Sequence, residues 1–140
     1  MDTPHAAPRA TGLHTLVVVL YLVLSLSALG RSGYQIATRF EEAPLAYSLS
    51  GLAAVMYVVA TTAIIAARNR VMRRVATVAV SLEALGVLTI GALSLLRPEL
   101  FPDATVWSGF GAGYVYIPLV LPFVGLWWML RLSRSEKAVR

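Results

Sequence analysis

The sequence contains no cysteine and only two histidines, His5 and His14. Without cysteine there is no disulfide, no thiolate metal site, no iron–sulfur cluster and no cysteine nucleophile. Both histidines lie within the first fourteen residues, which excludes a haem held by paired intramembrane histidines and a histidine-based triad within a membrane. No two acids stand three or four residues apart within a predicted helix. We therefore expect no metal, no cofactor and no enzymatic activity.

Charged residues are also scarce. They make up 14% of the 140 residues, against about 25% in soluble domains, while hydrophobic residues make up 58%. The mean hydropathy is +0.72. This composition is typical of an integral membrane protein. The net charge of +5 does not indicate a nucleic-acid partner, because the basic residues gather at the ends of apolar runs, where they face lipid headgroups.

Four apolar runs separate cleanly, at residues 13–29, 45–67, 75–96 and 110–130. Each reaches the roughly 17 residues that a helix needs to cross a bilayer core. A spanning segment must satisfy its own backbone hydrogen bonds, so each run is interpreted as a helix. The prediction is an all-α, polytopic membrane protein, an up-down bundle of four transmembrane helices. No linker divides the chain, so residues 1–140 are expected to form one membrane domain.

The basic residues also predict an orientation. The two tails and the second loop hold nine of them, whereas the first and third loops hold three. Positive loops stay in the cytoplasm, so we expect a multi-pass plasma-membrane protein with both termini cytoplasmic. The first span could also be a cleavable signal peptide, but its apolar run is longer than a typical signal sequence has, so we expect it to be retained. The arginines of the second loop could bind anionic lipid headgroups: Arg68, Arg70, Arg73 and Arg74.

Glu83 is the one formal charge well inside a predicted span. It follows Arg74 by nine residues, which corresponds to a depth of roughly 13 Å at 1.5 Å per residue. Small residues lie on its helical face, namely Ala76, Ala79 and Gly86, so this face is expected to point into the bundle. Burial disfavours the charged form of a carboxyl, and we expect Glu83 to be wholly or partly protonated at neutral pH.

The residues at the same depth on the first two spans are the candidate partners of Glu83. They are Tyr21 and Ser25 on the first span and Tyr57 and Thr61 on the second. A protonated Glu83 could bond to Tyr57 or Thr61, or to a backbone carbonyl freed by a proline. Two interpretations remain open. The cluster is either a hydrogen bond that packs helices together, or a proton or cation site, because intramembrane ionisable residues are often functional.

The fourth span carries two prolines, Pro118 and Pro122, four residues apart on one face. Proline inside a helix removes a hydrogen bond and bends the axis, so both are expected to kink this span. The kink is either a plain packing feature or a hinge beside a polar cavity. In the loop before this span, Trp107 is expected at the level of the lipid headgroups.

Residues 83–86 (Glu-Ala-Leu-Gly) and 101–108 (Phe-Pro-Asp-Ala-Thr-Val-Trp-Ser) resemble stretches of small, uncharacterised four-span integral membrane proteins of actinobacteria. The resemblance covers about the last sixty residues. It implies a bacterial source and the plasma membrane, and carries no activity.

The sequence thus leaves several functions open. We expect a non-enzymatic accessory or interaction subunit, packed against another membrane protein or against further copies of itself. The alternative is a homo-oligomeric, proton-coupled transporter or channel that uses Glu83. Lipid binding through the second-loop arginines is a third hypothesis.

Overall fold

The structure is a computed structural model that describes residues 9–139, so His5 and Arg140 lie outside the described residues. Within that range it is all-α, as predicted. Three helices are long and apolar enough to cross a membrane, or four if a bent pair counts as one span. The α-helices are α1 (Arg9–Arg39), α2 (Pro44–Ile65), α3 (Arg70–Leu96) and α4 (Ile117–Ala138).

The first helix is much longer than the apolar run that predicts it. α1 continues from the run at 13–29 to Arg39, through Gly30 and Gly33, and ends against the short 3-10 helix Phe40–Glu42. Pro44 then opens α2 in its first turn, where its missing N–H leaves no helical bond unmade.

The second loop is shorter than predicted. Asn69 caps the start of α3, its side chain accepting a hydrogen bond from the backbone N–H of Val71 at 2.8 Å. Because α3 begins at Arg70, three of the four arginines expected in this loop (Arg70, Arg73 and Arg74) lie instead on the first turns of a helix.

The prediction of one helix over residues 110–130 is wrong in its first part. The chain passes through two short 3-10 turns, Ser108–Phe110 and Ala112–Tyr114, and α4 begins only at Ile117, after a bend of 98°. Left-handed backbone causes the break, at Gly109 and Gly111 and also at Phe110, Val115 and Tyr116.

Pro118 therefore lies in the first turn of α4, where proline is well tolerated, and does not kink a helix as predicted. Pro122 is inside the helix. The apolar part of α4 that remains, residues 117–130, is roughly 14 residues or about 21 Å long, which is less than the bilayer core.

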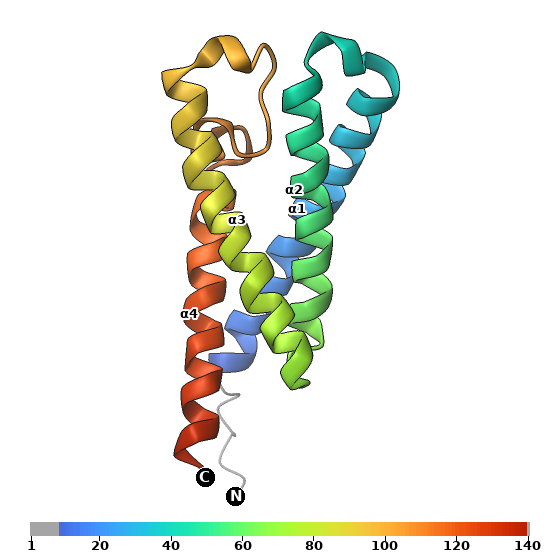
Figure 1. Ribbon diagram of the computed structural model, residues 1–140. Helices are drawn as coiled ribbons and strands as arrows, with labels where there is room; N and C mark the ends of the chain where they lie inside the picture. Colours follow the sequence, from blue (N-terminus) through green and yellow to red (C-terminus); the bar gives the residue numbers. More distant parts are fainter. Residues whose placement is uncertain (1–8, 140) are drawn as a thin grey trace, which may run out of the picture.

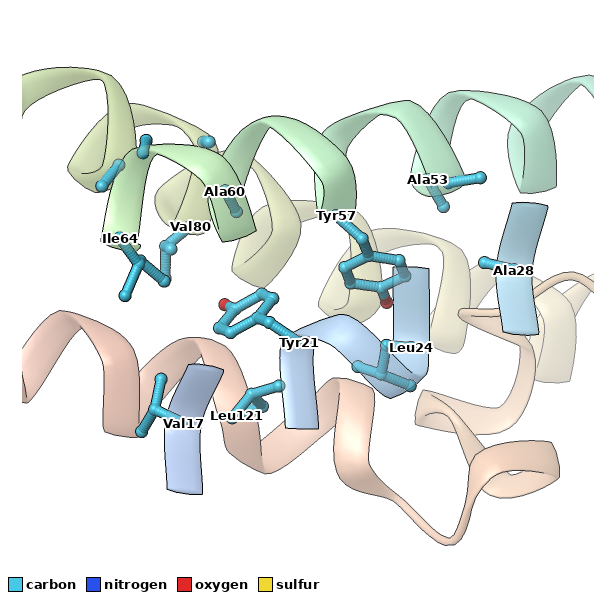
Figure 2. Packing of buried hydrophobic residues seen from close by; sticks show 14 of the residues in the cluster. Val17, Tyr21, Leu24, Ala28, Ala53, Tyr57, Ala60, Ile64, Val80 and Leu121 are labelled. Carbon is cyan, nitrogen blue, oxygen red and sulfur yellow. The ribbon is translucent and has the colours of Figure 1, made fainter. Parts of the chain in front are cut away.

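The helices lie side by side, and α1 begins and α4 ends at the same end of the molecule as the α2–α3 turn (Figure 1). The α1–α2 connection and the start of the α3–α4 connection lie at the opposite end, and the α3–α4 connection then runs back along the molecule to the start of α4 (Figure 1). Two large aromatic side chains, Tyr21 and Tyr57, fill the core between small residues such as Ala53 and Ala60 (Figure 2). Large aliphatic residues point outward, as they do when the surroundings are lipid.

Candidate functional site

Glu83 lies on the face of α3 that packs into the bundle, as predicted. Its side chain is completely buried, and so are Ala76, Val80 and Val87 on the same face. Small residues bring the neighbouring helices close to this face, so the carboxyl group is surrounded by protein.

Tyr21 is the hydrogen-bonding partner of Glu83. Its hydroxyl donates to Oε2 of Glu83 across 2.9 Å, joining α1 to α3. Oε1 of Glu83 is buried and has no hydrogen-bond partner among the described residues. Of the candidates at this depth, the structure selects Tyr21, and not Tyr57 or Thr61 as favoured from the sequence.

Tyr57 lies next to this pair and is bonded elsewhere. Its ring is tilted by 59° against that of Tyr21, with 6.3 Å between ring centres. Its hydroxyl accepts a hydrogen bond from Nε1 of Trp107 at 3.0 Å. Tyr57 therefore links the buried carboxyl cluster to the loop between α3 and α4.

The position of Trp107 corrects the expectation that it lies among the headgroups. The side chain is only 3% exposed and packs against Gly86 of α3. A Cβ atom at position 86 would come within 2.8 Å of the indole ring, so glycine is needed to make room for it. The sequence signal that could have revealed this was Gly86 itself, three residues after Glu83.

Ser25 and Thr61 form a separate pair beside the cluster. Their hydroxyl oxygens are 3.1 Å apart. Ser25 also donates to the carbonyl of Tyr21 at 2.7 Å, and Thr61 to that of Tyr57 at 2.6 Å. Neither makes a hydrogen bond to Glu83 among the described residues, so these two hydroxyls lie between α1 and α2 and do not bind the carboxyl.

Sequence reasoning missed a second polar cluster, at the end of the molecule that holds the α3–α4 connection. Asp103 accepts hydrogen bonds from Tyr47 at 2.9 Å and from Gln35 at 3.3 Å, and Arg31 lies 4.0 Å away. Arg31 also donates to the carbonyl of Ala104 at 3.2 Å. These contacts hold the loop against α1 and α2, which keeps Trp107 in the core.

The four arginines predicted to bind lipid divide into different environments. The guanidinium of Arg73 makes two hydrogen bonds to Glu136 of α4, at 2.5 and 2.7 Å, and a third to the carbonyl of Ala67. The Arg73 guanidinium holds the pKa of Glu136 below its usual range. Arg68 and Arg70 line a cleft with Arg73, whereas Arg74 is exposed outside its lining.

Among residues 9–139, no three histidine or acidic side chains come together as metal ligands. Comparison of the chain with protein-family models, with curated proteins and with solved structures finds no match.

Proposed function

We propose that the chain is a plasma-membrane protein with four spans and both ends in the cytoplasm, and that it acts as a non-enzymatic accessory or interaction subunit. The observation that carries this proposal is the closed environment of Glu83. The carboxyl is bonded to Tyr21 and completely buried, and it lines neither the cleft beside Phe123 and Trp127 nor the cleft beside Arg68 and Arg70. A polar group buried in this way fixes how the helices pack against one another. The outer surface of the bundle then remains available to contact partner proteins.

The loop between α3 and α4 further supports a structural interior. Trp107 packs on Gly86 and bonds to Tyr57, so the core above Glu83 is filled by an indole ring. Non-helical backbone is tolerated at membrane depth only where protein covers it, and residues 105–107 are buried accordingly. In this arrangement α4 is short, and the loop before it packs where the first part of a fourth full-length helix would otherwise lie.

Native mass spectrometry after gentle extraction from the source membrane tests the subunit role. We expect a stoichiometric complex that contains a second membrane protein, in wild type and in a Glu136→Gln control alike. A homo-oligomer without any other chain would contradict the proposal.

The chain's lack of cysteine makes the orientation easy to test. Single cysteines at Asn69, in the α2–α3 turn, and at Glu99, in the α3–α4 connection, can be probed in intact cells with a membrane-impermeant thiol reagent. We expect labelling at position 99 and protection at position 69 until the membrane is permeabilised. The reverse labelling pattern would show that the protein has the opposite orientation in the membrane.

A homo-oligomeric, proton-coupled transporter or channel is the second candidate. The observation that favours it is Oε1 of Glu83, a buried carboxyl oxygen without a partner among the described residues. A transporter or channel of this kind predicts a pH-dependent flux in proteoliposomes. Glu83→Gln should abolish this flux, and Glu136→Gln should leave it intact. Proteoliposomes without flux, or a flux insensitive to Glu83→Gln, would rule it out.

A further inference from the structure

A cleft of about 820 Å³ opens at the end of the molecule where α1 begins and α4 ends. Its walls come from the end of α2, the first turns of α3 and the last turns of α4, with His14 contributed by α1. The volume falls within the range of about 300–1,000 Å³ that is common for small-molecule sites. The α2–α3 turn places the cleft where the apolar part of the bundle meets its basic end.

The lining of the cleft carries a net positive charge. It carries Arg68, Arg70 and Arg73, against the single carboxylate of Glu136. Glu136 occupies the guanidinium fork of Arg73 with its two hydrogen bonds. Arg68 and Arg70 are exposed and make no salt bridge within residues 9–139, so their donors remain available to an anion.

The rest of the lining is mostly apolar and aromatic. It includes Ile64, Ile65 and Leu132, and the ring of Trp128 stacks on that of His14 with 4.7 Å between ring centres. Tryptophan is favoured at the boundary between headgroups and acyl chains, because its ring is apolar and its N–H is polar. A ligand that suits this mixed lining combines a negative group with hydrocarbon.

We propose that this cleft binds an anionic phospholipid, with its phosphate at Arg68 and Arg70 and the start of its acyl chains against Ile65 and Leu132. Arginine matches phosphate because its planar fork donates two parallel hydrogen bonds. Inorganic phosphate would use the arginines and leave the apolar wall unfilled. The site is narrower than the four-arginine cluster expected from the sequence, since Arg73 is occupied by Glu136 and Arg74 lies outside.

Native mass spectrometry of the full chain in a neutral detergent tests the proposal. The protein is titrated with phosphatidylglycerol, with phosphatidylcholine of the same acyl chains, and with inorganic phosphate. We expect phosphatidylglycerol to bind more tightly than phosphatidylcholine, and phosphate not to displace it. Arg68→Gln with Arg70→Gln should weaken phosphatidylglycerol binding by about 30-fold, since each basic residue near an anionic lipid contributes about 1 kcal/mol, or about fivefold.

The matched control, Arg134→Gln with Lys137→Gln, removes the same amount of charge from the same end of the molecule, at positions of α4 that do not line the cleft. This control should change the affinity by less than about threefold, the screened effect of exposed charge. Equal losses of phosphatidylglycerol affinity in the two double variants would mean that the lipid is attracted by the overall positive charge. This result would contradict a defined site at Arg68 and Arg70. So would equal binding of the two lipids, or displacement by phosphate.

A second variant tests the apolar wall without changing charge. Ile65→Ser alters a side chain that is 56% exposed, so folding should be preserved. We expect phosphatidylglycerol binding to weaken by about fivefold, because less apolar surface is buried against the acyl chain. Unchanged phosphatidylglycerol binding in this variant would contradict the proposal that the cleft binds a lipid, and would leave only a site for an anion.

Discussion

Two glutamate carboxyl groups in this molecule each accept hydrogen bonds from another helix, in opposite surroundings. Glu83 of α3 is completely buried and receives one bond from the neutral hydroxyl of Tyr21. Glu136 of α4 has a side chain that is half exposed and receives two bonds from the guanidinium of Arg73. The first pair lies in the centre of the bundle, and the second at its charged end.

The difference shows that burial decides what a polar contact contributes. Water competes at the charged end, where Glu136 is half exposed, so the ion pair there contributes less net stability than the same contact would in the interior. In the interior no water competes, and a group left without its partner is costly. We therefore expect changes around Glu83 to alter the fold, and changes around Glu136 to alter mainly the charge that the molecule presents.

The largest effect is expected from Trp107→Ala, which removes a buried indole from the interior and leaves the hydroxyl of Tyr57 without its donor. Truncation of a buried tryptophan costs about 3–5 kcal/mol of unfolding free energy. Unfolding in mixed detergent micelles measures it. The control is Trp127→Ala, whose side chain is 47% exposed and stacks under Arg131. Equal losses at the two positions would mean that Trp107 is not packed in the core.

The next effect separates packing from hydrogen bonding at Glu83. Glu83→Ala leaves a cavity and an unpartnered Tyr21 hydroxyl, and should cost about 2–4 kcal/mol. Glu83→Gln keeps both the volume and an acceptor, so it should cost less than about 1 kcal/mol. The same micelle assay compares them, with Glu136→Ala as the exposed counterpart. A larger loss for Glu136→Ala than for Glu83→Ala would reverse the comparison.

A smaller effect of opposite sign, a gain in unfolding free energy, is expected at Val115. This residue lies in the α3–α4 connection, which also contains Trp107. Val115 has a φ of +56°, which is unfavourable for a β-branched residue. Val115→Gly should raise the unfolding free energy by about 1 kcal/mol, because glycine adopts this conformation freely. The control Val78→Gly, at an exposed helical position, should lower it by about the same amount. A loss in both variants would show that Val115 is not strained.

The smallest effect is the pH dependence of the exposed pair. Because Arg73 lowers the pKa of Glu136 below its ordinary value of 4.5, the ionised carboxylate stabilises the folded state above pH 4.5. That contribution is lost as the pH falls through the lowered pKa. The difference in unfolding free energy between wild type and Glu136→Gln should therefore be constant near neutrality and shrink below pH 4.5. A difference that persists in acid would mean that the ion pair is not its source.

Much of the candidate site follows from helical periodicity. The inward face of Glu83 could be predicted from the small residues three and four positions away, and Tyr21 could be named as a candidate from its depth alone. The choice between Tyr21 and Tyr57 could not, because depth does not give the rotation of one helix about another. The buried position of Trp107 could not be predicted for a related reason, since a tryptophan at the membrane interface and one folded into a bundle have the same local sequence.

The sequence by itself determined that the chain is helical and apolar enough to enter a membrane, because composition and the length of apolar runs depend only on which residues follow one another. It also determined that one acid would lie on an inward face. Only the tertiary structure decided that α4 begins at Ile117 and that Asp103 holds the preceding loop against α1 and α2. It also decided that Arg73 pairs with Glu136, across 63 positions of sequence. Those outcomes depend on contacts between distant segments, which no local pattern encodes.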